Sequence, residues 1–138
     1  MIIFKIIFWL SFSVVGAWFS SDAFFVAFGE PEKVVTIVGI LNLWGSVTCT
    51  FLGVYVAYYF IMERLKSPVS HKRFNIIGVS LAIVIAPLLT LGVYSKSLSN
   101  VSSYVECDGL RELSSRYSSR TYAVSDEVCL TVVVDEKQ

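Results

Sequence analysis

The chain has 138 residues, of which 55% are hydrophobic and only 16% are charged, and its formal net charge is zero. A soluble domain of this length has too small a core to bury so much apolar side chain, which excludes the soluble globular class. The mean hydropathy of +0.69 is typical of a membrane protein, in which the bilayer covers the apolar surface.

The first predicted membrane-spanning helix covers about residues 2–20 and is interrupted only by Lys5. The long stem of this lysine allows its charge to reach the lipid headgroups. A signal peptide is the competing interpretation of the segment. No convincing small-x-small cleavage site precedes Ser20, and the apolar character resumes at Phe24, so a retained anchor is favoured.

Asp22 follows this first segment and allows two interpretations. If the helix continues to Phe28, the carboxylate lies in the outer leaflet, where an ionisable group is costly and therefore points to function. If the helix stops near Ser20, residues 20–22 form an interfacial turn and residues 24–28 lie along the membrane surface. The turn is favoured, and Asp22 stays a candidate functional polar residue.

The second predicted helix covers residues 34–62 without a charged residue. At 1.5 Å per residue it exceeds a hydrocarbon core of roughly 30 Å, so it must tilt or protrude. Asn42 is the other candidate functional polar residue, although a hydrogen bond to another helix is the favoured role. The third predicted helix covers residues 76–94, and Pro87 is expected to kink it.

Small residues recur at four-residue spacing on the second and third predicted helices. Such stripes let helix backbones approach each other inside a bilayer, so these two helices are predicted to pack together. The predicted packing residues are Gly45, Cys49, Gly53, Gly78, Ala82 and Ala86.

A short basic loop, Glu63–Asn75, lies between the second and third predicted helices. Its basic residues are Arg64, Lys66, Lys72 and Arg73. Short loops rich in Lys and Arg stay on the cytoplasmic side, so the amino terminus is predicted to be cytoplasmic and the carboxyl-terminal tail external. With this topology the cytoplasmic parts carry a charge of about +4 and the external parts about −4.

The external tail contains two of the three cysteines, Cys107 and Cys129, while Cys49 lies inside the second helix. An oxidising compartment favours a disulfide over a metal site. The runs Thr121–Ser125 and Cys129–Val134 are predicted strands, with Tyr104–Cys107 as a third. The sequence therefore predicts an α-helical membrane protein, with a three-helix domain over residues 1–94 and a small disulfide-closed, β-containing tail over residues 95–138.

Two roles for this tail are left open on equal terms. It caps the structure by packing on the outer loop Ser20–Lys33, or it forms a recognition surface, because Arg and Tyr side chains anchor interfaces. The candidate partner-binding residues are Arg111, Arg116, Tyr117, Arg120 and Tyr122.

The sequence contains little catalytic chemistry. Its single histidine, His71, has no cysteine or carboxylate cluster at metal-ligand spacing beside it, and no phosphate loop, nucleophile elbow or zinc motif occurs. An enzyme, a cofactor and nucleic-acid binding are therefore not expected. The predicted partners are the lipid bilayer and another protein, and a homo-oligomeric channel is left open.

Three short motifs resemble a family of small enterobacterial inner-membrane proteins of unknown function, domain of unknown function family 1240. They are Ser21-Asp22-Ala23-Phe24-Phe25, Tyr104-x-x-Cys107, and Tyr122-x-x-Ser125-x-x-x-Cys129. The resemblance implies a bacterial inner membrane and a periplasmic, disulfide-closed tail. The sequence after Cys129 departs from the family pattern, in which the chain stops soon after the last cysteine.

The small size, the scarcity of catalytic motifs and the external tail are also similar to immunity proteins that protect bacteria from their own membrane-targeting toxins. The functional hypothesis is a non-enzymatic inner-membrane immunity protein that binds and neutralises a membrane-targeting or pore-forming toxin. The alternative is an accessory or structural subunit of a larger envelope transport or secretion complex.

Overall fold

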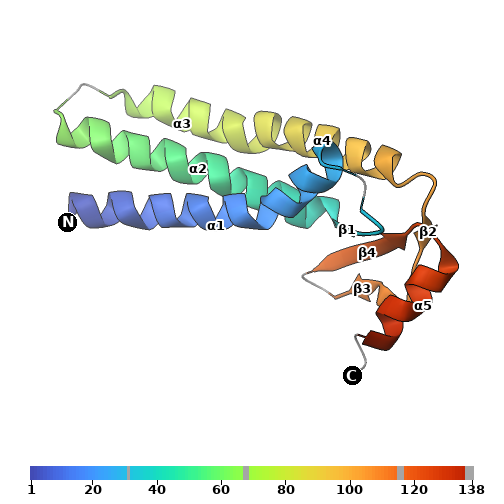
Figure 1. Ribbon diagram of the computed structural model, residues 1–138. Coiled ribbons are helices and arrows are strands. Elements are labelled where there is room, and N and C mark those ends of the chain that lie inside the picture. The colour runs from blue at the N-terminus through green and yellow to red at the C-terminus, as the bar shows by residue number, and fades with distance from the viewer. Residues whose placement is uncertain (31, 67–68, 115–116, 136–138) are drawn as a thin grey trace. The chain divides into compact units, whose positions relative to one another are not determined.

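The computed structural model describes residues 1–30, 32–66, 69–114 and 117–135. The chain divides into two compact units (Figure 1). The helical unit comprises Met1–Ser21 and Trp44–Thr90, and the sheet unit comprises Asp22–Leu43 and Leu91–Gln138.

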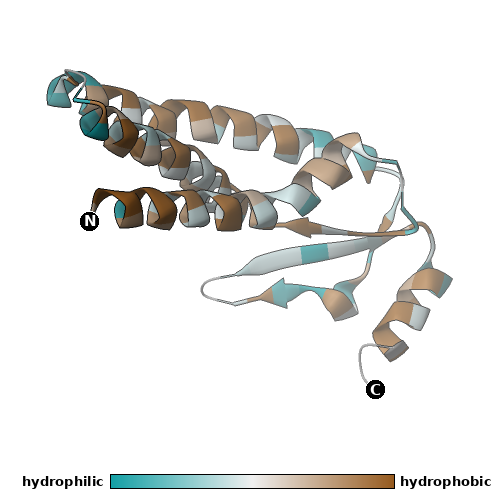
Figure 2. Ribbon diagram, turned by 60° about the vertical axis from the view of Figure 1, so that its left-hand side comes forward, coloured by the Kyte–Doolittle hydropathy of each residue, from teal (hydrophilic) through white to brown (hydrophobic). Residues whose placement is uncertain are grey.

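Among the described residues, three helical segments are long and apolar enough to cross a membrane, as predicted. They are α1 (Ile2–Phe28), α2 (Ile40–Arg64) and a continuous segment over His71–Asn100 that contains α3 (His71–Ser80), the π-helical turn η1 (Leu81–Ile85) and α4 (Ala86–Asn100). Figure 2 shows hydrophobic residues along most of their length.

The predicted helix boundaries are wrong at four places. The first helix continues to Phe28, the second begins at Ile40, and the third begins at His71 and ends at Asn100. Hydropathy marks the stretch that fits a hydrocarbon core, whereas the helical hydrogen bonding of the first and third segments continues beyond that stretch. The second helix begins later than predicted because residues 34–38 form a strand. The favoured turn at residues 20–22 is therefore also wrong, because Asp22 is helical.

The distortion expected at Pro87 takes the form of the π-helical turn that precedes it. The backbone N–H of Ala86 donates to the carbonyl of Leu81, five residues earlier. Proline cannot donate to the carbonyl four residues before it, and its ring crowds that carbonyl. The wider π turn accommodates this local break in the hydrogen-bond ladder.

The close approach of α1 and α2 depends on two glycines. A Cβ at Gly53 would lie 2.6 Å from the Cβ of Ser13, and one at Gly16 would lie 2.7 Å from the carbonyl oxygen of Ser46. The hydroxyl of Ser13 donates to the carbonyl of Thr50 over 2.8 Å. These glycines allow backbone contact that any side chain would prevent.

The second and third helical segments also meet, as predicted, where aromatic residues of α2 lie beside Gly78 and Ala82 of the predicted small-residue stripe. The ring of Tyr55 stacks on Phe74 and lies 3.5 Å from a Cβ built at Gly78. The indole nitrogen of Trp44 donates to the carbonyl of Ala82 over 3.1 Å. Gly45 was wrongly predicted to pack, because no described atom lies within 4 Å of a Cβ built there.

Cys49 is half-buried and Ala86 is fully buried in the helical unit. The ammonium of Lys5 lies 5.1 Å from the centroid of the Phe60 ring. The start of α1 therefore lies beside the end of α2, as an antiparallel pair requires.

The described part of the sheet unit contains four antiparallel strands: β1 (Val34–Val38), β2 (Val105–Glu106), β3 (Glu112–Leu113) and β4 (Ser118–Ala123). β4 pairs with each of the other three. Val35, Ile37 and Val101 form the core of this unit. The last turns of α1 and α4 contribute Val26 and Tyr94 to the same core.

β1 was predicted as the start of the second membrane helix and is instead a strand. The run Val-Val-Thr-Ile-Val is β-branched throughout, which favours a strand over a helix when a partner strand is available. β4 supplies that partner, in the register Val34↔Ala123 to Val38↔Ser119.

The predicted strand Cys129–Val134 is wrong, because this run lies in the helix α5 (Asp126–Asp135). Two acidic residues, Asp126 and Glu127, occupy its first turn, where negative charge favours a helix. The predicted strand at Thr121–Ser125 corresponds to the end of β4, and that at Tyr104–Cys107 contains β2.

We predict that Gly53→Ala lowers the free energy of unfolding by about 1–3 kcal/mol, because the added methyl overpacks the α1–α2 contact. The measurement is thermal or denaturant unfolding of the full chain in detergent. Gly45→Ala is the matched control, and it should leave stability unchanged or raise it by up to about 1 kcal/mol through helix propensity. Equal effects of the two variants would contradict the assigned contact.

Candidate functional site: the β1 groove

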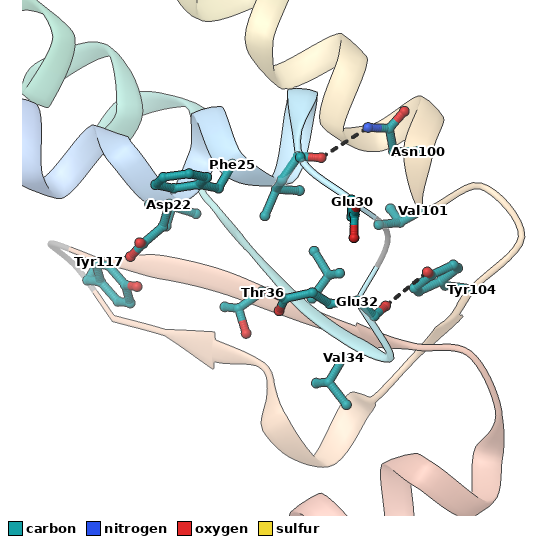
Figure 3. A pocket seen from close by; sticks show the side chains of 14 residues that line it. Asp22, Phe25, Glu30, Glu32, Val34, Thr36, Asn100, Val101, Tyr104 and Tyr117 are labelled. Carbon is teal, nitrogen blue, oxygen red and sulfur yellow. Dashed lines mark hydrogen bonds between the residues drawn. The ribbon is translucent and has the colours of Figure 1, made fainter.

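A cavity of about 830 Å³ in the sheet unit borders β1 (Figure 3). Its lining comes from the last turns of α1, the α1–β1 connection, β1, the end of α4 and the residue that precedes β4. We call this cavity the β1 groove. It combines an apolar surface with acidic side chains and a strand edge.

The last turns of α1 form one wall, through Asp22, Phe25 and Val26. The end of this helix is held by Asn100, whose amide donates to the carbonyls of Val26 and Ala27 over 3.0 and 2.9 Å. The last carbonyls of a helix have no partner within the helix, so this side chain completes their hydrogen bonding.

The α1–β1 connection contributes two carboxylates, Glu30 and Glu32, to the groove. The hydroxyl of Tyr104 donates to the backbone carbonyl of Glu32 over 2.9 Å, and both residues are labelled in Figure 3. Tyr104 thereby fastens the connection to the segment that follows α4. The tail therefore contacts the connection through Tyr104. Packing of the tail on the outer loop was one of the two roles that the sequence left open.

β1 contributes Val34, Val35, Thr36 and Val38 to the groove. Val35 lies in the core, whereas Thr36 is exposed. The hydroxyls of Thr36 and Thr121 form a hydrogen bond of 3.1 Å across the strand pair. This cross-strand bond adds to the backbone pairing that fixes the register of β1.

The charge of the groove is negative. Asp22, Glu30 and Glu32 line it, and no Lys or Arg does so among the described residues. In Figure 3 the carboxylate of Asp22 and the ring of Tyr117 lie at the same end of the groove. Phe25 is 72% exposed, which leaves an aromatic face open to an occupant.

The structure separates the residues that were predicted to bind a partner. Tyr117 lines the β1 groove, whereas Arg120 and Tyr122 line a different hollow, of about 170 Å³. Arg111 is exposed after the 3-10 turn η2 (Asp108–Leu110). Arg116 lies outside the described residues.

Arg120 is engaged within the sheet. Its Nε lies 3.8 Å from a carboxylate oxygen of Glu106. A hydrogen bond with Tyr122 and the charge of Glu106 raise the pKa of the Arg120 guanidinium. This cation is therefore already opposed by an anion of the same sheet, and it is a weaker candidate for recognition than the sequence indicated.

The two polar candidates of the helices lie in different surroundings. Asp22 is exposed and lines the groove. Asn42 is half-buried and has an interaction partner of its own. The structure therefore favours Asp22 as a site residue.

Most residues of the groove were not predicted as site residues from the sequence. They include Phe25, Glu30, Glu32 and the edge of β1. A signal was present in the sequence: a β-branched run over residues 34–38 follows charged residues and precedes Gly39. That pattern is typical of a strand bounded by turns.

The disulfide between Cys107 and Cys129 is present, with Cα atoms 5.6 Å apart. It joins the end of β2 to α5. α5 also contacts β4, so the bond holds the helix beside the central strand.

Among the described residues, no group of three or more His, Cys, Asp or Glu is arranged so that it could hold a metal ion. His71 lies in the helical unit, where its Nδ1 is 3.1 Å from the hydroxyl of Tyr59. Its neighbours are aromatic rings, including Tyr59. These contacts give it a packing role.

We predict that replacing Cys107 and Cys129 together by Ser lowers the stability of the sheet unit by about 3 kcal/mol, because the open chain regains loop entropy when it unfolds. Limited proteolysis and thermal unfolding of the full chain measure the change. Cys49→Ser is the control, since Cys49 is a free thiol. Equal protease resistance of the double variant and the control would contradict the stabilising role of the bond.

No protein-family model, no curated protein and no solved structure matches this chain.

Proposed function

We propose that the protein is a non-enzymatic immunity protein of the bacterial inner membrane, which binds and neutralises a membrane-targeting or pore-forming toxin. The observation that carries the proposal is the β1 groove, an open, acidic and partly apolar cavity beside a strand edge. A binding protein requires such a surface. The helices would hold that surface at the membrane that the toxin attacks.

The groove offers groups that bind rather than react. Its described lining supplies carboxylates, aromatic rings and aliphatic side chains. These side chains suit recognition of a polypeptide, because apolar contacts supply binding energy while charges select the partner. Binding alone suffices for immunity, since an occupied toxin cannot insert or assemble.

The proposed orientation places the basic loop in the cytoplasm and the sheet unit in the periplasm. Arg64, Lys66, Lys72 and Arg73 supply the positive-inside signal. The pairing of β1 with β4 supports this arrangement, because the α1–α2 connection and the segment after α4 must then share one side of the membrane. The contact of Lys5 with Phe60 supports an amino terminus on the opposite side.

We predict that a membrane-impermeant maleimide labels Leu113→Cys in intact spheroplasts, but labels Leu65→Cys only after the membrane is permeabilised. The two positions are matched, since Leu113 is 69% and Leu65 is 68% exposed. Both variants carry Cys49→Ala so that no other free thiol reacts. Labelling of Leu65→Cys in intact spheroplasts would contradict the proposed orientation.

We predict that deleting the gene makes cells sensitive to killing by sister cells that carry a neighbouring toxin gene. Re-expression of the full chain should restore survival to the wild-type level, and colony counts in mixed culture measure both effects. Unchanged survival of the deletion strain would refute the immunity role. Co-purification of a constant housekeeping complex in mild detergent would instead support the accessory-subunit alternative.

A further inference from the structure

The hydrogen-bonding register of β1 shows which of its backbone groups face β4 and which face outward. The carbonyl of Lys33 accepts from the N–H of Val124, and the N–H of Gly39 donates to the carbonyl of Ser118. Hydrogen-bonded pairs alternate along antiparallel strands, so the backbone groups of Val35 and Ile37 also face β4. Those of Val34, Thr36 and Val38 therefore face away from β4.

Nothing in the described part of the chain pairs with this outer edge. β1 pairs with β4 alone among the described strands. The three residues whose backbone groups face outward, Val34, Thr36 and Val38, all line the β1 groove. Val34–Val38 contains no charge and no proline, the residues that usually protect an exposed edge from pairing with another chain.

The shape and charge of the groove define its occupant. An open strand edge accepts an extended segment that adds one more strand to the sheet. The carboxylates of Asp22, Glu30 and Glu32 attract a segment that carries Lys or Arg. The exposed ring of Phe25 provides a face on which such a cation can rest.

We propose that the β1 groove binds an extended, positively charged peptide segment, which pairs with β1 as an additional strand. This inference deepens the proposed function and rests on it, because the segment belongs to the toxin that the protein neutralises. A second copy of this chain is a poor occupant, since two acidic grooves brought together would repel each other.

The test uses the full chain in nanodiscs of zwitterionic lipid, with a fluorescein-labelled heptapeptide of alternating lysine and valine as the probe. Fluorescence anisotropy should show saturable binding, and the same peptide with glutamate in place of lysine should bind at least about tenfold more weakly. Thr36→Pro should weaken binding at least about tenfold, because it removes an outward N–H that a strand partner needs. Thr36→Ala keeps that N–H and should bind within about twofold of the native chain.

Thr36→Pro leaves every inward-facing hydrogen bond of β1 possible, and protease resistance checks that the sheet still forms. Peptides N-methylated at alternate residues provide a test on the native chain. Methylation of one alternate set should abolish binding and methylation of the other should spare it, because only one set of amides in a strand faces its neighbour.

The inference would be overturned by any of these results in the binding assays: no saturable binding of the lysine peptide, equal binding by Thr36→Pro and Thr36→Ala, or equal effects of the two methylated sets. A dimer that Thr36→Pro dissociates would also overturn it, with a second copy as the occupant. Failure of the immunity proposal can be told apart from failure of this inference. It appears as unchanged survival of the deletion strain, whether or not the peptide binds. If cells with Thr36→Pro lose protection and cells with Thr36→Ala keep it, this result supports both the immunity function and strand pairing at β1.

Discussion

The antiparallel pairing of β1 with β4 is the constraint on which the sheet unit depends. It joins the connection between α1 and α2 to a strand that follows α4, in a register from Val34↔Ala123 to Val38↔Ser119. This pairing directs Val35 and Ile37 into the core, and it leaves the other backbone edge of β1 beside the groove. A shift of one residue would exchange the two faces and remove both the core and the groove.

The helical part of the fold was predictable because hydropathy reports directly on what the bilayer must cover. The disulfide was predictable because two cysteines lie in one polar tail. The sheet was only partly predictable. Val34–Val38 looks like the start of a membrane helix until its partner is known, and the valine run after Cys129 looks like a strand although Asp126 and Glu127 begin a helix there. Composition alone allows either a helix or a strand in both segments. Pairing with β4 makes the first a strand, and the acidic first turn favours a helix in the second.

The site was less predictable than the fold, since it consists mainly of backbone geometry. The arginines were predicted to bind a partner because Arg and Tyr are common in interfaces. In the structure, Arg120 is opposed by Glu106 within the sheet. Free strand edges have no residue signature of their own. Of the five residues predicted to bind a partner, Tyr117 lines the groove, and so does Asp22, which the sequence had placed in a turn.

The distance along the chain between β1 and β4 has a consequence for the order of events during synthesis. β1 leaves the ribosome before α2, and its partner strand follows some 80 residues later, which at typical synthesis speeds takes roughly 4–16 s. During that interval both edges of β1 are unpaired. The groove therefore comes into existence only with the last part of the chain, and a truncated product would retain its membrane helices without gaining the surface to which we assign binding.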